Sequence, residues 1–336
     1  IYLLWKLFKF FWNERYMDFP VALLENCIKT AQRENIAYAN ELYTSLNEIK
    51  ANNQTSEYSY WSLLEPSTEI LEYNNDLKRT GFSNLVHDAK FTANVYESIL
   101  DIPAENVAQQ LALIEENLYE KITIFDCLDR VWGCKQCDFG GSKNISEFIS
   151  FANSITKYVS YKILQYDTAA KRGQAIGYFI KVARISYEIN NFSSMTAIIS
   201  GIYASPVNRL HESWKLVSRE LQNTLRELDD LMISTKNFLK YRLTLKNVGN
   251  RPCIPFFGVY LSDLLFTHNG NPDYVDKSRG TVNFTKRFRI FDIIQEIFHY
   301  KKVKYEYKAD LDIIHHIMNV AENVPDVENQ YHLSLQ

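Results

Sequence analysis

The sequence predicts an all-α protein. Only 11 of its 336 residues are glycine and 8 are proline, so glycine is roughly 3% of the chain against the ~7% of an average protein. Apolar residues make up 46% of the chain, which is enough to build a core. They recur at helical spacing in one segment after another, without an internal repeat of 20–50 residues. These observations favour long helices over a many-stranded sandwich or barrel.

Charge and composition exclude several broad classes of protein. The formal net charge is −3, from 37 basic and 40 acidic residues, which argues against a broadly basic nucleic-acid binder. The sequence contains no run of 18 uncharged apolar residues, so it predicts no membrane-spanning helix. The cysteine count of 5 is odd and low, which favours a reducing compartment over a disulfide scaffold. The chain begins at Ile1, and we expect it to be a fragment whose natural start lies upstream.

The first part of the chain is predicted to be a small helical domain and a linker. Apolar spacing predicts helices over 1–12, 21–28 and about 35–49. Residues 50–60 are polar and lack periodicity, which predicts a loop. The weakly patterned stretch that follows is the expected domain boundary. We therefore divide the chain into a first domain over 1–95 and a second over 96–336.

The second domain opens with a succession of helices. Asp101 is the expected N-cap of the first, and Pro103 lies near its first helical position, where a missing N–H costs little. A polar loop is predicted over about 133–144. The apolar stripes lie at 107–118, 148–163, 176–187, 195–202 and 214–228, and the last of these predicts one long helix.

The sequence carries no local motif for covalent, nucleotide or metal chemistry. Glycine-rich phosphate loops and H-E-x-x-H are absent, and Cys134 and Cys137 lack the second pair that a zinc site needs. His315 and His316 diverge on a helix, which predicts two ordinary half-exposed histidines. A catalytic triad assembles in space, so its absence from local sequence is weak evidence. We expect no cofactor, no metal and no bond-breaking active site.

Residues 250–300 are the most informative part of the chain. Pro255 is suited to open a helix, and the run 269–272 (Asn-Gly-Asn-Pro) is suited to end it. A second helix is predicted from near Asn283 or Thr285 to about Tyr300, after a loop that is long for a helix–helix connection. The pattern predicts two antiparallel helices that form a hairpin. The basic first turn of the second helix and the apolar residues near the end of the first helix have two interpretations. They are a functional surface, or the basic turn is an ordinary solvated face and the apolar residues are core.

Nine blocks of sequence, in order and spacing, resemble the catalytic domain of Ras-family guanine-nucleotide exchange factors. The resemblance covers about 100–315, and residues 1–50 are more weakly similar to the later helices of the Ras exchanger motif that precedes that domain. The blocks are Ala108–Glu115, Leu128–Trp132, Asn190–Gly201, Ser205–Leu210, Lys236–Arg242, Pro252–Phe256, Leu261–Leu264, Gly270–Asp273 and Val282–Arg287.

The resemblance implies a multi-helical catalytic domain with a protruding helical hairpin, preceded by a small helical exchanger-motif domain. The implied activity is non-covalent. The hairpin is pushed against the nucleotide and Mg²⁺ site of a Ras-like GTPase, Ras or Rap, and GDP leaves. The implied location is cytoplasmic, with recruitment to membranes only through the lipid-anchored GTPase, and nucleic acid is not an expected partner.

The family's functional residues carry over by position. Leu265 matches an apolar residue placed near the Mg²⁺, Phe256 an aromatic near switch II, and Ser262 a small polar contact. With Asn269, these three are the predicted catalytic residues. The predicted GTPase-binding residues are Tyr203, Arg209, Tyr260, Phe266, Asn271, Lys286, Arg289 and the pair Asn190 and Asn191, for which a buried capping role is an equal alternative.

Two positions depart from the family pattern. Many members carry Glu where this chain has Asn269, and an uncharged amide imitates a phosphate less well. Some members directed at Rap also lack that Glu and share a run similar to 268–274, which tilts the prediction slightly towards Rap. Tyr203 replaces a smaller polar residue. The alternative function is an exchange-inactive module or scaffold that binds a GTPase with the same fold.

Overall fold

The computed structural model describes residues 98–128, 143–322, 324–325 and 327–335, with residue 96 and a few positions between 28 and 47. The chain divides into two compact units, 1–81 and 82–336, and the description below concerns the second. The described positions between 28 and 47 are helical. Most of the predicted front helices, the loop over 50–60 and the Cys134–Cys137 pair lie outside the described residues. The domain boundary after residue 95 stays a prediction.

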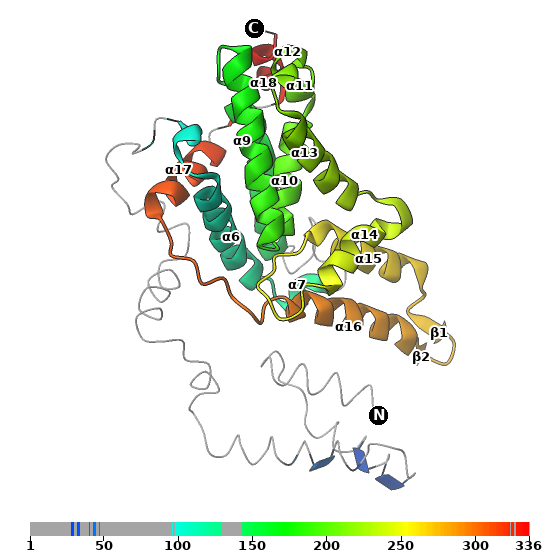
Figure 1. Cartoon of the computed structure of the whole chain (residues 1–336). Coiled ribbons are helices and arrows are strands. Elements are labelled where there is room, and N and C mark those ends of the chain that lie inside the picture. The colour runs from blue at the N-terminus through cyan, green and yellow to red at the C-terminus, as the bar shows by residue number, and fades with distance from the viewer. Residues whose placement is uncertain are drawn as a thin grey trace. The chain divides into compact units, whose positions relative to one another are not determined.

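The all-α prediction is confirmed, because the described residues of the second unit form helices and one two-stranded sheet. Helices α6, α8, α9 and α10 lie side by side and make the body, with α10 packed between α8 and α9 (Figure 1). The elements are η2 (Ile99–Asp101), α6 (Ala104–Glu120), α7 (Ile124–Cys127), α8 (Lys143–Leu164), α9 (Ala169–Glu188), α10 (Phe192–Ile202), α11 (Ser205–Asn208), α12 (His211–Lys215), α13 (Arg219–Leu231), α14 (Thr235–Lys246), α15 (Phe257–Gly270), β1 (Tyr274–Asp276), β2 (Thr281–Val282), α16 (Phe284–His299), α17 (Leu311–Glu322) and α18 (Val327–Leu333).

The body helices bury the stripes that the sequence predicts. Ile114 on α6, Ile155 on α8, Ile180 on α9 and Ile202 on α10 are each at most 1% exposed. Close packing of α10 on α8 depends on Gly201, because a Cβ there would lie 2.6 Å from the carbonyl oxygen of Thr156. The helices therefore meet as a dense core that supports everything attached to their ends.

Three details differ from the sequence prediction. The stripe over 214–228 is not one helix, because the Ser218 hydroxyl accepts from the backbone N–H of Leu221 (3.3 Å) and starts α13 there. Asp101 does not cap α6: it closes a capping box with Ser98 around η2. His316 is only 5% exposed and not half-exposed, since α17 packs on α6 and α8, and burial lowers its pKa.

Glu116 on α6 makes the stability of the fold depend on pH. Its Oε1 accepts from the backbone N–H of Tyr305 (3.0 Å), and burial, partly opposed by Lys304, raises its pKa from 4.5 to about 7. A carboxyl whose pKa is higher in the folded state makes the fold less stable as pH rises from about 4.5 to 7. Above pH 7 the full cost of burying the charged carboxylate is present.

We expect Glu116→Gln to raise the free energy of unfolding at pH 8 by roughly 2–3 kcal/mol and to change it little at pH 4.5. The amide keeps an acceptor for Tyr305 and has no charge to desolvate. Urea denaturation at the two pH values measures the difference. Glu105→Gln, on the exposed side of the same helix, is the control. Equal stabilities of wild type and Glu116→Gln at pH 8 would contradict this reading.

Within the described residues, no helix is both long and apolar enough to cross a membrane. In that same part of the chain, no three His, Cys, Asp or Glu side chains gather in a group that could hold a metal ion.

Candidate functional site

Helices α15 and α16 form a hairpin that projects from the body, with β1 and β2 at its outer end (Figure 1). The predicted helix ends are confirmed: α15 ends at Gly270, and Asn283 caps α16 by accepting from the N–H of Lys286 (3.2 Å). The connecting loop is not irregular throughout. Its strands pair in antiparallel register, Tyr274 opposite Val282, a feature too short for the sequence to signal.

The root of the hairpin is fixed in the body by aromatic side chains. Phe257 is 2% exposed and packs edge-to-face on two other rings. Its ring centroid lies 6.1 Å from that of Tyr119 and 5.8 Å from that of Phe148. The Tyr119 hydroxyl donates to the carbonyl of Ile297 on α16 (2.8 Å). Such edge-to-face pairs add about 0.5–1.5 kcal/mol each beyond the area they bury. Both hairpin helices are thus held at their inner ends.

The extended approach to α15 is paired with the start of α10. The N–H of Phe192 donates to the carbonyl of Ile254 (2.9 Å), and the N–H of Ile254 donates to the carbonyl of Asn190 (3.0 Å). Asn190 adopts a left-handed conformation (φ 61°), and its side chain donates to the carbonyl of Pro252 (3.1 Å). Asn tolerates that conformation better than most residues, which explains its use at this corner.

A buried carboxylate lies beneath this corner. Glu115 on α6 is fully buried and accepts from the hydroxyls of Ser193 (2.7 Å) and Ser194. Asn191 caps α10 by accepting from the N–H of Ser194 (3.0 Å). Burial raises the pKa of Glu115, and the hydroxyl hydrogen bonds oppose the rise. The network joins α6, the N-terminus of α10 and the approach to the hairpin.

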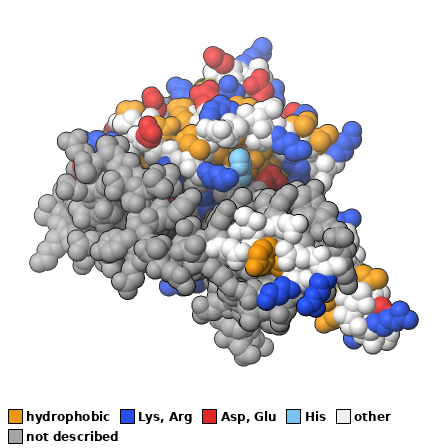
Figure 2. Space-filling model, turned by 90° about the horizontal axis from the view of Figure 1, so that it is seen from below, with side chains coloured by type: hydrophobic (Ala, Val, Ile, Leu, Met, Phe, Trp, Pro, Cys, Tyr) orange, Lys and Arg blue, Asp and Glu red, His pale blue; other side chains and the backbone are white. Residues whose placement is uncertain are grey.

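The outer end of the hairpin is organised around Asp273. Its Oδ1 lies 2.9 Å from the Lys286 ammonium and 2.9 Å from the Arg287 guanidinium, which hold the pKa of the carboxyl below its usual range. Lys286 is only 1% exposed. Beyond this cluster, apolar side chains lie beside basic ones at the right-hand edge of Figure 2. The exposed apolar residues there are Tyr274, Val275, Val282 and Phe284.

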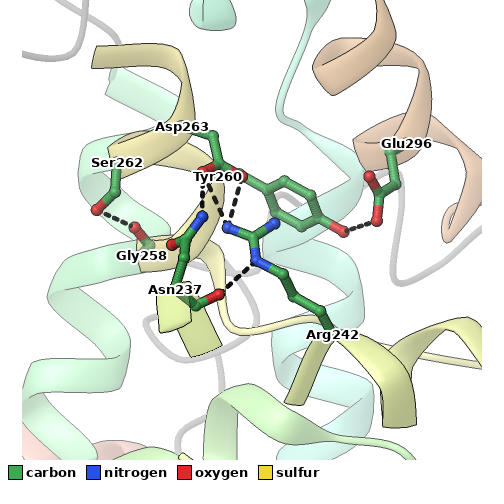
Figure 3. Close-up of polar contacts among 7 residues, drawn as sticks. All are labelled: Asn237, Arg242, Gly258, Tyr260, Ser262, Asp263 and Glu296. Atoms are coloured by element: carbon green, nitrogen blue, oxygen red, sulfur yellow. Dashed lines mark hydrogen bonds and ion pairs between the residues drawn. The ribbon is translucent and has the colours of Figure 1, made fainter. Parts of the chain in front are cut away.

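The side of α15 is tied to α14 by an ion pair, shown in Figure 3. The Arg242 guanidinium lies 2.8 Å from Asp263 Oδ2, and its Nε donates to the carbonyl of Asn237 (2.8 Å). Asn237 belongs to a left-handed turn over 236–238, with φ of 52°, 55° and 57°. This conformation costs about 1–2 kcal/mol per residue and persists only where contacts hold it. Across the hairpin, the Tyr260 hydroxyl donates to Glu296 (3.2 Å).

Comparison with protein families matches the RasGEF domain to residues 106–288, a span that includes the body, the approach and the whole of α15. The chain belongs to the RasGEF domain family. Among similar proteins are "Cell division control protein 25" of Saccharomyces cerevisiae, 39% identical over 97% of this chain, and "Guanine nucleotide exchange factor SDC25" of the same organism, 37% identical over 98%. "Ras guanine nucleotide exchange factor I" of Dictyostelium discoideum is 28% identical over 88%.

The chain spans only part of these relatives: 21%, 26% and 36% of their respective lengths. The predicted resemblance to Ras-family exchange factors is confirmed at the level of the family. The individual site residues are not tested by these similarities, and they stay predictions.

Most of the predicted site residues lie on or beside the hairpin of this RasGEF domain. Phe266 is 73% exposed, and Leu265 beside it is half-buried. Asn269 is exposed at the end of α15, and Arg289 donates to Asn271 (3.4 Å). Phe256 and Ser262 are half-buried at the inner half of α15. These side chains are therefore at least partly exposed on or beside the hairpin.

Other predicted residues are built into the fold. Tyr260, Lys286 and Asn191 are each at most 1% exposed. In this structure they therefore have structural roles and are not accessible to a partner. Tyr203, 38% exposed, caps the C-terminus of α10. Arg209 follows α11, at the end of the body away from the hairpin, and stacks on Tyr331 of α18 (4.7 Å) (Figure 1).

Sequence reasoning missed four charged residues that shape the site: Glu115, Arg242, Asp263 and Asp273. Each lies inside a block that carries the family resemblance, which was the available signal. None was singled out, because each partner is distant in sequence. Asp263 meets Arg242 only once α15 lies beside α14, and Asp273 meets Lys286 only once the hairpin has formed.

We expect Asp273→Ala to loosen the outer end of the hairpin far more than Lys286→Met. Removing the carboxylate leaves a buried ammonium without its counter-charge, whereas methionine fills the same space without one. Hydrogen exchange over residues 271–283 measures the difference, and the double variant should resemble Lys286→Met alone. Equal loosening by the two single variants would contradict this interpretation of the pair.

Proposed function

We propose that this RasGEF domain accelerates the release of GDP from a Ras-like small GTPase, Ras or Rap, by placing the outer half of α15 at the nucleotide and Mg²⁺ site. Family membership supports the class of activity. The observation that carries the proposal is the hairpin itself. It is fixed at its root and side, and it presents Leu265, Phe266 and Asn269 on a projecting helix.

The physical basis is linkage between two binding events. A small GTPase orders its switch regions through contacts to phosphate and Mg²⁺. A protein that binds the nucleotide-free form more tightly must weaken nucleotide binding by the same factor, and each ~1.4 kcal/mol of coupling is tenfold in affinity. No covalent step is needed, so the proposed role is exchange and not bond-making catalysis.

Leu265 and Asn269 have distinct proposed roles. A divalent cation such as Mg²⁺ requires oxygen ligands, so the apolar Leu265 side chain close to it would make its coordination unfavourable. Asn269 would offer an amide towards the phosphate loop of the GTPase, without the charge of a carboxylate. Phe256 and Ser262 would contact switch II along the inner half of the same helix. The remaining predicted contacts would frame this surface.

The test is release of a fluorescent GDP analogue from Ras, Rap, Ral and Rho-type GTPases at increasing concentrations of the chain. Concentration-dependent acceleration on Ras or Rap is the expected result, and it names the partner. No acceleration on any of them, with the chain folded, would contradict the proposal. The GTPase would also be the proposed link to membranes, so attaching it to vesicles should recruit an otherwise cytoplasmic chain.

A second candidate function is a module that binds a GTPase without exchanging it, and Asn269 motivates it. The variant Asn269→Glu separates the two candidates. If wild type binds a GTPase but leaves GDP release unchanged while Asn269→Glu accelerates it, the chain is a binding module. If wild type already accelerates release, the carboxylate is dispensable and the exchange function stands.

A further inference from the structure

We propose that Arg242 and Asp263 are positioning residues for nucleotide exchange: their ion pair fixes the angle at which α15 leaves the body, and with it the location of Leu265 and Asn269. The inference rests on the proposed function and adds residues that touch neither nucleotide nor Mg²⁺. It starts from the contacts that α14 makes with the side of the hairpin (Figure 3).

Helix α15 is attached to α14 at two levels. At its N-terminus, the N–H of Phe256 donates to the Tyr241 hydroxyl (2.8 Å), and the Phe256 ring lies 6.5 Å from that of Phe238. Seven residues further along, Asp263 meets Arg242. A rigid helix held at one level pivots, whereas one held at two levels about 10 Å apart has a fixed direction. The ion pair therefore supplies the second level.

Arg242 is suited to this task because it binds both elements at once. Its terminal nitrogen lies 2.9 Å and 2.8 Å from the two carboxylate oxygens of Asp263, while Nε donates to the carbonyl of Asn237. The guanidinium fork makes these contacts from one plane, which a lysine ammonium cannot reproduce. The two side chains are 26% and 20% exposed, so solvent screens this pair less than a fully exposed one.

The left-handed turn of α14 holds the ion pair in position. Arg242 holds the turn through the Asn237 carbonyl, and the Asn237 amide reaches towards Asp263 (3.5 Å). Phe238, in the same turn, supports Phe256. Releasing Arg242 would therefore free the turn and the side of α15 together. Leu265 lies two residues beyond Asp263 and Asn269 lies six beyond it, so an altered helix direction displaces both.

The experiment compares Arg242→Gln, Arg242→Lys and Asp263→Asn with wild type. Arg184→Gln is the control, because Arg184 also pairs with a carboxylate (its Nε lies 2.8 Å from Glu188 Oε1) but lies on α9, away from the hairpin. We expect the three variants to lower the maximal rate of GDP release at least about fivefold, with affinity for the nucleotide-free GTPase nearly unchanged. The control should leave both quantities unchanged. The exchanged pair, Arg242→Asp with Asp263→Arg, should recover part of the lost rate.

Hydrogen exchange on the chain alone tests the positioning without a GTPase. In Arg242→Gln, the amides of 257–270 should exchange faster while those of α9 do not change. Unaltered exchange in α15, or an unaltered maximal rate, would overturn the proposal. A fall in rate that parallels loosening of the whole body would also overturn it, since the pair would then be merely structural. If wild type accelerates GDP release from none of the GTPases, that result contradicts the proposed exchange function itself, before any variant is compared.

Discussion

Leu265→Ala should slow GDP release at least tenfold while leaving the fold intact. The rate falls because α15 loses the apolar side chain proposed to lie close to the Mg²⁺. A tenfold change corresponds to about 1.4 kcal/mol of transition-state stabilisation. The fold survives because Leu265 is half-buried on a projecting helix. Stopped-flow release of a fluorescent GDP analogue, with thermal unfolding of the same samples, measures both quantities.

The neighbouring leucine provides the control. Leu264 is 2% exposed, and Leu264→Ala should cost about 2–5 kcal/mol of stability because it leaves a cavity. The two substitutions remove the same atoms from adjacent residues, so their effects should separate cleanly into function and stability. A large fall in melting temperature for Leu265→Ala, or unchanged release kinetics, would count against the role given to this residue.

Glu115→Ala should also cause a large loss of stability. It leaves the hydroxyls of Ser193 and Ser194 buried without their acceptor, and each such group costs about 1–3 kcal/mol. A loss of about 3 kcal/mol lowers the melting temperature by roughly 6–12 °C in a domain of this size. Differential scanning calorimetry is the measurement.

The effect should depend on the acceptor and not on helix α6 itself. Glu115→Gln keeps one acceptor oxygen and should lose less stability than Glu115→Ala, while the exposed Glu105→Ala should lose little. Because the network also supports the pairing of Asn190 with Ile254, faster hydrogen exchange at Ile254 should accompany the loss. A melting temperature unchanged by Glu115→Ala would show that the network is not a structural support.

The helices of the body and of the hairpin could be predicted because their signal is local. Apolar residues at helical spacing, with Asn283 at one helix start and the run 269–272 at one helix end, were sufficient to place α15 and α16. The break at Ser218 was missed because the apolar stripe continues across it, and only a side-chain hydrogen bond reveals the new start.

The site could be predicted only in part, because several of its interactions join distant segments. Lys286 reads as a surface cation in the sequence, and its burial follows from the loop that brings Asp273 back over α16. His316 is buried for a similar reason, since α17 packs against helices far upstream. The ion pair of Arg242 with Asp263 needs the left-handed turn, a conformation that Asn237 tolerates but that Lys236 and Phe238 do not signal.

The most direct test of the account is the affinity of the chain for one GTPase in two states, nucleotide-free and loaded with GDP and Mg²⁺. Linkage requires the chain to bind the nucleotide-free state more tightly, by the same factor by which it weakens GDP binding. We expect a ratio of at least about 100, equivalent to roughly 2.7 kcal/mol of coupling. Equal affinities would contradict exchange, because a protein that does not distinguish the two states cannot shift the nucleotide equilibrium, and the chain would then be a binding module.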